Sequence, residues 1–306
     1  MGAMLYFFQQ ALNGLHSSAL YALLAFGYAL THGVLHRTNI AYGGVFAFTG
    51  QTMILLAVFG YQVLWLTLPA TIALAIVLAF FYAWLTSSIL SRNVLGPLAH
   101  SSPNAVVVAT LGVAIVLMEI TRISADTKDF WLPPMLSTPV VFASDVTFQA
   151  TLTVIQLINC SVAAVTILVA SLVLARTEVG RTWRAVCDDP RASALCGVDV
   201  SRVFHRSVLA GGFAAALAGI MAALYYGNIG FGAGLIFGLK ILFITAVGGY
   251  ETPAKAAAGA ATFGMAEALY SGYFPLEWRD AAMFAMLVAL LILRPSDGVE
   301  SRPARA

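Results

Sequence analysis

Two ionisable residues lie inside long apolar segments of the sequence and are the first candidates for chemistry. Lys240 stands in GLKILFITAVGG and Glu267 in GMAEAL. A charge at the centre of a bilayer costs roughly 2.5–3.5 kcal/mol on insertion scales, so such residues usually pair or contact a transported solute. Lys240 lies six residues after Gly234, and Glu267 lies eight residues before Pro275. At a rise of about 1.5 Å per residue the two depths match. We therefore expect an ion pair, with direct binding of a zwitterionic substrate as the alternative role.

Uncharged polar residues in or beside the apolar segments are further candidates. Gln51 lies well inside its segment and could hydrogen-bond a neighbouring helix or a passing polar group. Asn39, Tyr42 and Asn228 stand where glycine-rich segments begin, and such openings let a helix break or pack closely where it lines a path. The five histidines are scattered over segment ends and loops, so no metal site is predicted. The predicted translocation-path or intramembrane polar residues are Asn39, Tyr42, Gln51, Asn228, Lys240 and Glu267.

A polar stretch, residues 176–206, separates two apolar segments and contains a predicted short helix. The side chain of Asp188 or Asp189 can accept hydrogen bonds from the first free backbone N–H groups. Pro190 suits the first helical position, and Gly197 can end the helix in the left-handed conformation. About seven residues cannot form a stable helix alone in water. The helix therefore either docks on a partner or is an ordinary solvated loop helix. The residues assigned to docking are Asp189, Pro190, Arg191, Ala192, Ser193, Leu195 and Gly197.

The elements that would position these residues are membrane-spanning helices. The chain has 306 residues, of which 60% are hydrophobic and 10% charged, whereas soluble domains carry about 25% charged residues. We expect an all-α, polytopic membrane helix bundle of eight or nine spans, forming one transmembrane domain over residues 1–306. The first 36 residues contain no Lys or Arg, so the first segment is expected to be a permanent span rather than a signal peptide. The predicted spans are 11–33, 40–60, 65–90, 103–123, 150–175, 203–227, 235–250, 255–274 and 280–294.

The distribution of basic residues predicts the orientation. With the N-terminus outside, twelve of the sixteen Lys and Arg residues lie on the cytoplasmic side, three lie outside, and Lys240 lies within a span. Cytoplasmic loops are enriched in Lys and Arg, so we expect an N-out/C-in topology with residues 176–206 in the cytoplasm. The three cysteines form no CxxC motif and are expected to be free thiols.

Two apolar segments begin with nearly the same residues. NIAYGGVFAF, from Asn39, and NIGFGAGLIF, from Asn228, share four identical positions. Five predicted spans separate them, and because this number is odd the two copies would run in opposite directions. This is typical of the inverted-topology repeats of transporters. The alternative is a chance similarity between two glycine-rich membrane segments.

Several function classes are excluded in their usual forms. No lysine stands in a GK[ST] sequence, so a P-loop ATPase is excluded, and no HExxH motif of a metalloprotease occurs. Neither a basic tail nor an aromatic-interleaved basic patch indicates binding to nucleic acid. A self-sufficient secondary carrier stays open, because it would account for an inverted repeat and buried charges.

Together these segments resemble the permease subunits of branched-chain amino-acid ABC importers. The resemblance covers nearly the whole chain, and five stretches carry it: NGLHSSALYALLAFGYALTHGVLHRTNIAYG, NAVVVATLGVAIVL, RAVCDDPRASALCGVDVSRV, GLKILFITAVGG and GMAEAL. The chain departs from the family at Tyr42, where His is usual, near Gly44, where an acidic residue is usual, and at GGYETPAKA, which replaces a Gly-Ser-x-x-Gly turn. These departures affect the expected substrate more than the family.

The resemblance implies a fold, a function and partners. The fold would be that of an ABC-importer permease in the bacterial inner membrane, and the helix from Asp189 to Gly197 would be the coupling helix that docks on an ATPase. The partners would be a second homologous permease, two ATPase subunits that bind ATP and Mg, and an extracytoplasmic substrate-binding protein. The chain itself would be no enzyme and would bind no cofactor. The substrate would be a branched-chain or apolar amino acid, with urea, short amides or a sugar as alternatives.

Overall fold

Local sequence signals begin most of the helices. The computed structural model describes residues 2–99, 101–144, 149–250 and 252–293. Proline stands in the first turn of α3, α5, α8 and α11, where its missing N–H costs no hydrogen bond. Ser102 and Asp199 accept hydrogen bonds from the first turns of α5 and α9, and a capping box begins α6. The long helices are α1 Gly2–Leu35, α2 Ala41–Gln62, α3 Leu68–Ile89, α5 Pro103–Ser124, α6 Val154–Arg176, α9 Val200–Tyr226 and α11 Pro253–Tyr273.

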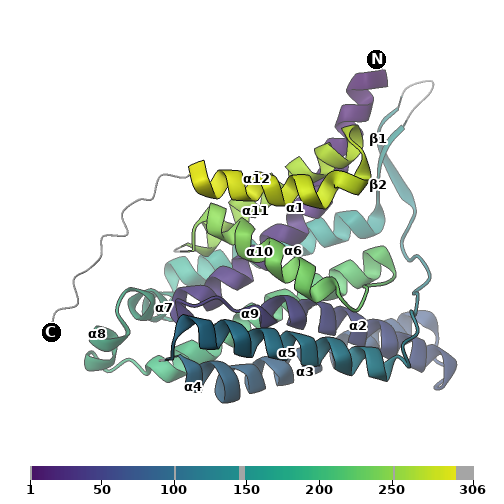
Figure 1. The fold of residues 1–306 in the computed structure, drawn as a ribbon. Helices are drawn as coiled ribbons and strands as arrows, with labels where there is room; N and C mark the ends of the chain where they lie inside the picture. Colours follow the sequence, from purple (N-terminus) through teal and green to yellow (C-terminus); the bar gives the residue numbers. More distant parts are fainter. Residues whose placement is uncertain (1, 100, 145–148, 251, 294–306) are drawn as a thin grey trace.

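Shorter elements connect or follow these helices. The π-helical turn η1 Leu90–Leu95 and α4 Gly96–Leu98 extend α3. The remaining elements are the antiparallel strands β1 Pro139–Ser144 and β2 Gln149–Thr153, α7 Glu178–Asp188, α8 Pro190–Leu195, α10 Ala233–Gly248, η2 Leu276–Trp278 and α12 Arg279–Leu293. Below, "the hairpin end" is the end of the bundle that carries β1 and β2, and "the α8 end" is the opposite end, which carries α7 and α8 (Figure 1).

The polytopic helical bundle is confirmed, but the count of eight or nine spans is not. Among the described residues, six helices are long and apolar enough to cross a membrane, and α10 with α11, bent by 114°, adds at most a seventh. Two predicted spans, 235–250 and 280–294, correspond to helices of 16 and 15 residues. Helices of that length reach only about 24 Å, less than the roughly 30 Å of a bilayer core. Residue 294 lies outside the described residues.

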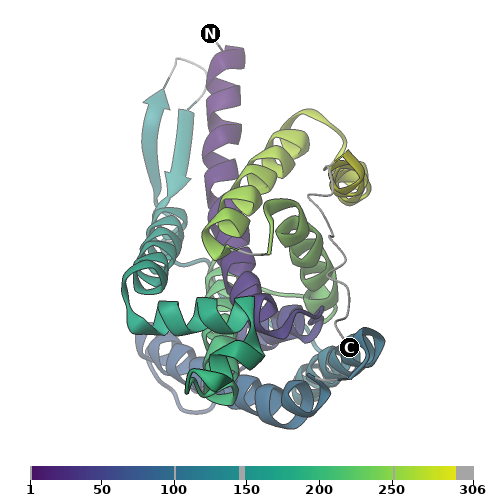
Figure 2. The same ribbon diagram turned by 90° about the vertical axis from the view of Figure 1, so that its left-hand side faces the viewer.

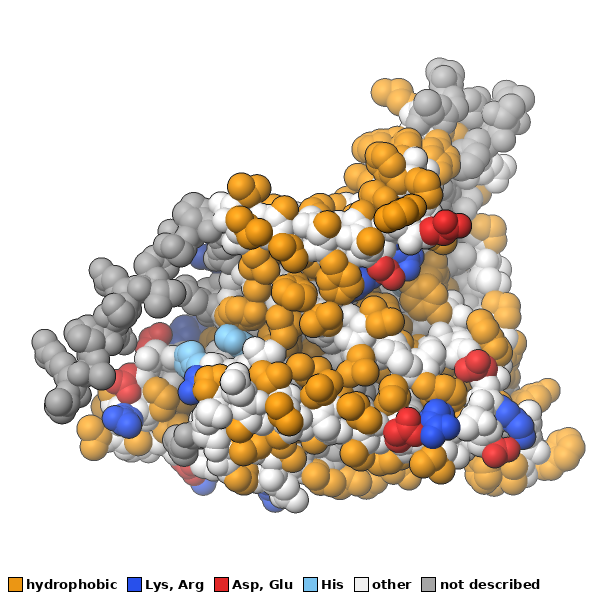
Figure 3. Space-filling view, viewed as in Figure 1, with side chains coloured by type: hydrophobic (Ala, Val, Ile, Leu, Met, Phe, Trp, Pro, Cys, Tyr) orange, Lys and Arg blue, Asp and Glu red, His pale blue; other side chains and the backbone are white. Residues whose placement is uncertain are grey.

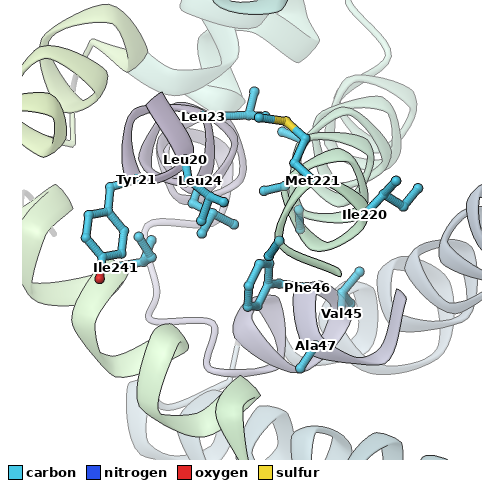
Figure 4. Packing of buried hydrophobic residues seen from close by; sticks show 14 of the residues in the cluster. Leu20, Tyr21, Leu23, Leu24, Val45, Phe46, Ala47, Ile220, Met221 and Ile241 are labelled. Carbon is cyan, nitrogen blue, oxygen red and sulfur yellow. The ribbon is translucent and has the colours of Figure 1, made fainter. Parts of the chain in front are cut away.

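Helix α1 occupies the middle of the bundle. It contacts α6, α9, α10 and α11, and the end-on view shows these helices around it, with α12 at the edge (Figure 2). Helix α2 packs on α3, α5, α9 and α10. The core lies where α1, α2 and α9 meet, as the close-up shows (Figure 4). Its members include Leu20, Leu23, Leu24, Val45, Phe46, Ile220 and Met221.

Helices α2 and α10 pack against each other in opposite directions. At one end of the contact a β-carbon on Gly43 would overlap the backbone of Gly234 and Gly238. Further along α2, Gln51 Nε2 donates a hydrogen bond to the carbonyl oxygen of Ile229, which precedes α10, at 3.0 Å. Residue numbers therefore increase along α2 in the direction in which they decrease along residues 229–238, so the two segments run antiparallel. Small residues permit this close antiparallel approach.

The helix contacts also suggest an internal repeat, in which α1 corresponds to α9, α2 to α10, α3 to α11 and α5 to α12. When each helix is replaced by its counterpart, a contact in one half becomes a contact in the other. The contact of α2 with α3 corresponds to that of α10 with α11, and the contact of α2 with α5 to that of α10 with α12. Likewise α2 with α9 corresponds to α10 with α1, and α3 with α9 to α11 with α1. All eight contacts are present in the structure.

The sequence does not predict the two strands or the helix α7. The strands β1 and β2 form a hairpin with a register irregularity between Val141 and Ala143, so the span expected from residue 150 begins as a helix only at Val154. In the 176–206 stretch a second helix, α7, precedes the short one. Its Trp183 is buried, and the indole Nε1 donates a hydrogen bond to the carbonyl oxygen of Leu30 on α1 at 3.3 Å. The loop is therefore fixed to the bundle.

Candidate functional site

Lys240 and Glu267 form the expected ion pair, and two further residues join it. Lys240 Nζ lies 3.0 Å from Glu267 Oε1 and 2.9 Å from Asp280 Oδ1. Arg279 Nε lies 3.6 Å from Glu267 Oε1 and 3.5 Å from Asp280 Oδ1. Each charge thus faces two opposite charges in a closed ring, which we call the four-charge ring. Its net formal charge is zero.

The two halves of the ring differ in exposure. The side chains of Lys240 and Glu267 are 4% and 9% exposed, whereas those of Arg279 and Asp280 are 38% and 51% exposed. Lys240 is held on α10 and Glu267 on α11, while the turn η2 brings the first residues of α12 over the pair. Burying a charge is tolerated only when it is paired. The ring therefore lets two charges lie inside an apolar bundle.

The ring forms one wall of a cavity of about 470 Å³ near the hairpin end, which we call the ring cavity. Helices α1, α9, α10, α11 and α12 all contribute to it. A second wall is aromatic and aliphatic, and polar α1 residues such as Gln10 and Asn13 complete the lining. In the space-filling view this face is largely hydrophobic, with a small group of acidic and basic side chains visible near α12 (Figure 3). The residues of the apolar wall are Leu20, Tyr21, Tyr225, Tyr226, Ile236 and Phe237.

Lys240 and Glu267 do not use all of their hydrogen-bonding groups within the ring. The hydrogen bonds that Lys240 Nζ donates within the described chain go to Glu267 and Asp280, although an ammonium group has three donors. No described atom is in hydrogen-bonding geometry with the buried Oε2 of Glu267, while the hydroxyl of Tyr21 interacts with the same carboxylate. Lys240 and Glu267 both line the cavity, and Lys240 keeps one donor that no described hydrogen bond uses.

Gln51 and Asn228 come together elsewhere. Both line a small pocket formed by α2, residues 125–130 and the segment that precedes α10. The Gln51 amide nitrogen is used in the hydrogen bond to Ile229, and its buried Oε1 has no hydrogen-bond partner among the described residues. Gln51 therefore links α2 to the loop residue Ile229, and its role in the translocation path stays a prediction.

Asn39 and Tyr42 are buried at the start of α2, where they face α1. The backbone N–H of Asn39 donates to the hydroxyl of Tyr28 at 3.4 Å, and the Tyr42 hydroxyl donates to the carbonyl oxygen of Leu24 at 2.9 Å. The rings of Tyr28 and Tyr42 meet edge to face at 5.5 Å. These contacts hold the start of α2 against α1. They do not bring the two residues to the ring cavity, whose lining comes from other residues.

The short capped helix of the 176–206 stretch is present as α8. Asp189 Oδ1 accepts from the backbone N–H groups of Arg191 and Ala192 at 2.8 and 3.1 Å. Gly197 follows with a positive φ of 85°. Apart from the buried Ser193, the helix is exposed, and the side chain of Leu195 is 91% exposed. An apolar side chain held out in this way on a rigidly attached helix is suited to contact with another protein.

Comparison with known proteins identifies the family. Residues 10–291 match the family model described as branched-chain amino acid transport system / permease component. This chain belongs to that permease family. It is similar, at 28% identity over 303 residues, to the high-affinity branched-chain amino acid transport system permease protein LivH of Escherichia coli and of Salmonella typhimurium, with 98% of this chain and 97% of the relative covered.

A more distant relative agrees. The permease protein BraD of Pseudomonas aeruginosa, from a system of the same name, is 26% identical over 304 residues, which is 97% of both chains. No solved structure matches the chain. The family, together with the six helices of the described residues that are long and apolar enough to cross a membrane, makes this chain a multi-pass permease of the bacterial inner membrane. The family description is that of a transport component rather than an enzyme.

Arg279 and Asp280 are the functional candidates that sequence reasoning missed. They follow the loop residues YFPLEW and resemble ordinary charges at the start of a helix. The sequence does contain one indication, because a basic and an acidic residue stand side by side at the start of an apolar segment. Such a pair could neutralise a buried pair of opposite charges. Only the turn η2 shows that they reach Lys240 and Glu267.

Proposed function

We propose that this chain is the permease subunit of a binding-protein-dependent ABC importer and forms part of the translocation path for branched-chain or other apolar amino acids. The observation that carries the proposal is the match to the permease family over nearly the whole chain. The relatives' names assign branched-chain amino acids to those proteins. The four-charge ring beside an apolar wall is compatible with such a substrate.

The proposed assembly contains a second homologous permease, two ATPase subunits that bind ATP and Mg, and an extracytoplasmic substrate-binding protein. This chain supplies no ATPase activity and no cofactor. Its docking surface for the ATPase is α8, with Asp189, Pro190, Arg191, Ala192, Ser193, Leu195 and Gly197. The exposure of Leu195 and the firm capping of the helix support this role.

The structure offers a route by which movement of α8 could reach the substrate path. Helix α8 contacts α7 and α9, and α7 contacts α1, α6 and α9. Trp183 ties α7 to Leu30 of α1, and Gly33 leaves the space that its indole occupies. Helices α1 and α9 in turn line the ring cavity near the hairpin end. Closure of the ATPase pair would thus tilt the helices that bound the cavity.

We further propose one permease domain over residues 1–306, with eight or nine membrane segments, of which an odd number cross the bilayer, an N-out/C-in orientation and an inverted-topology repeat. The antiparallel packing of α2 on α10 and the matching pairs of helix contacts support the repeat. In this orientation the hairpin end faces outward and residues 176–206 face the cytoplasm. Pseudo-twofold repeats of this kind place a substrate path near the repeat interface.

A stand-alone secondary carrier is the main competing function, and urea, short amides or a sugar are competing substrates. Mild-detergent purification of the chain from native membranes, with mass-spectrometric identification of its partners, distinguishes the importer from the stand-alone carrier. We expect two P-loop ATPases and a related permease. A chain that purifies alone and still transports leucine after reconstitution would refute the importer. Uptake of urea or ribose but not of leucine by the complete assembly would refute the substrate class.

A further inference from the structure

We propose that the ring cavity binds the zwitterionic head group of a free α-amino acid within the membrane-spanning subunit itself. Lys240 and Arg279 face the substrate carboxylate, Glu267 faces the substrate ammonium group, and the apolar wall receives the side chain. This inference rests on the proposed function, because it names how an amino acid is held after the binding protein has released it.

The unused hydrogen-bonding groups match the head group. The buried Oε2 of Glu267 accepts no hydrogen bond of normal geometry from the described residues, although the Tyr21 hydroxyl interacts with the same carboxylate. An ammonium group is a donor with no acceptor. Lys240 Nζ has two of its three donors engaged, and a carboxylate only accepts. Lys240 Nζ lies 3.0 Å from Oε1 of the same carboxylate, so the ammonium group and the carboxylate are neighbours at the ring. An α-amino acid presents both complementary groups on a single carbon atom.

The zero net charge of the ring disfavours ligands that carry a net charge. The ring contains two positive and two negative groups. A ligand with a net charge would leave one charge unpaired in a site of low dielectric constant, which is costly. A zwitterion adds one charge of each sign and keeps the balance. Urea and sugars bring no charges to match the ring.

Size and polarity of the remaining wall fit an apolar side chain. Small-ligand sites span roughly 300–1,000 Å³, and this cavity has about 470 Å³. Phe237 belongs to the apolar wall, and its ring centroid lies 6.0 Å from Lys240 Nζ. The apolar wall continues over Leu20, Ile236 and the tyrosines of α9. A branched aliphatic side chain would lie against this wall while the head group meets the ring.

Direct binding to the purified importer, without its binding protein, tests the inference. The probe is radiolabelled L-leucine at concentrations up to the millimolar range. Leucinamide, which lacks the carboxylate, and 4-methylpentanoate, which lacks the ammonium group, are the competitors. We expect saturable binding that unlabelled leucine displaces and that each competitor displaces at least tenfold less well. Absence of saturable binding, or equal displacement by all three compounds, would overturn the inference.

A matched pair of variants locates the site. Ile236 lines the cavity and Leu239 does not, yet both stand on α10 and are 51% and 43% exposed. Ile236→Trp would fill the cavity and should weaken leucine binding at least tenfold, whereas Leu239→Trp should leave it within twofold of the wild type. Both side chains have free space, so neither variant should impair folding. Equal binding by the two variants would place the leucine elsewhere.

Glu267→Gln gives a readout that a purely structural role would not produce. The change keeps the side-chain volume, leaves Asp280 as partner of Lys240, and makes the ring net positive. Leucine affinity should fall, and 4-methylpentanoate should become the better ligand of the two. An unchanged preference would contradict the head-group assignment. Leucine uptake driven by ATP but insensitive to all these variants would refute this inference alone, whereas absence of ATPase partners would refute the proposed function.

Discussion

Gly43 of α2 and Gly238 of α10 bring two antiparallel helices into backbone contact. A β-carbon on Gly43 would overlap the α-carbon and nitrogen of Gly238 as well as the carbonyl oxygen of Gly234. The neighbours that would have to move are main-chain atoms, which cannot rotate away as a flexible side chain does. The contact lies where the two similar sequence segments cross, so the segments that resemble each other in sequence also pack backbone to backbone.

Gly43→Ala should therefore destabilise the folded permease. Overpacking of a tight core typically costs about 1–3 kcal/mol, and here helices α2 and α10 would have to separate. We expect a lower thermal midpoint of the detergent-solubilised protein and a reduced yield of monodisperse material. Gly112→Ala is the control, because no heavy atom lies within 4 Å of a β-carbon at that position. Equal midpoints for the two variants would show that the helices do not touch at Gly43.

Charge exchange within the four-charge ring should be only partly tolerated. Lys240→Glu places three carboxylates around Arg279, and breaking a buried ion pair typically costs about 3–5 kcal/mol. Adding Glu267→Lys restores the central pair, but the carboxylate introduced at position 240 would then face Asp280. We expect the yield of folded protein to fall strongly for the single variant and to recover in part for the double variant. A double variant no better than either single one would argue against the pair.

Substitutions on α8 should separate transport from membrane insertion. Arg191→Glu reverses an exposed charge on the proposed docking surface, and Gly197→Pro forces the backbone away from its φ of 85°. Both variants should insert normally and lose nearly all ATP-driven uptake, because the helix could no longer engage the ATPase. Arg181→Glu, on the exposed side of α7, is the control and should retain uptake. Wild-type uptake by both α8 variants would remove the coupling role.

Thiol labelling should distinguish two nearby cysteines and test the orientation. Burial, together with the charge of Asp188, raises the pKa of the Cys187 thiol to about 12, and only the thiolate reacts rapidly. Because the pKa is raised, Cys187 stays protonated at neutral pH and becomes reactive only in strongly alkaline solution. Cys196, directly after α8, is exposed. A membrane-impermeant maleimide should therefore label Cys196 at neutral pH and spare Cys187, as peptide mass spectrometry would show.

The membrane side of that label decides the topology. With the N-terminus outside, Cys196 lies in the cytoplasm and should react in inside-out vesicles but not in right-side-out vesicles. Cys196→Ser is the control and should remove the signal. Labelling confined to right-side-out vesicles would reverse the proposed orientation.

Features set by neighbouring residues could be predicted from the sequence. The helix α8 is predictable because its cap, its proline and its terminal glycine lie within nine residues, and Asp189 and Gly197 play the expected roles. The pairing of Lys240 with Glu267 is predictable because two unpaired charges inside apolar helices would each be costly. The long apolar helices likewise follow from hydrophobic length alone.

Features set by distant contacts could not be read in this way. Nothing near Arg279 in the sequence shows that η2 turns the chain toward α11 and closes the ring. The hairpin was missed because QATLT precedes an apolar helix directly and resembles its first turn. Hydropathy predicts full spans for the late segments because it reports apolar length, whereas the bend of 114° between α10 and α11 depends on the fold.

Neutrality of the four-charge ring bears on how the membrane voltage acts on transport. Moving one elementary charge through 100 mV involves about 2.3 kcal/mol. The ring sums to zero, and an amino acid with an apolar side chain carries no net charge near neutral pH. Binding of the amino acid therefore leaves the net charge of the ring at zero. Movement of the site through the transmembrane field then involves no electrical energy, whether the amino acid is bound or not. In the proposed importer nucleotide hydrolysis would then set the direction of the cycle, so we expect a cell that has lost its membrane potential but keeps its ATP to accumulate the substrate still.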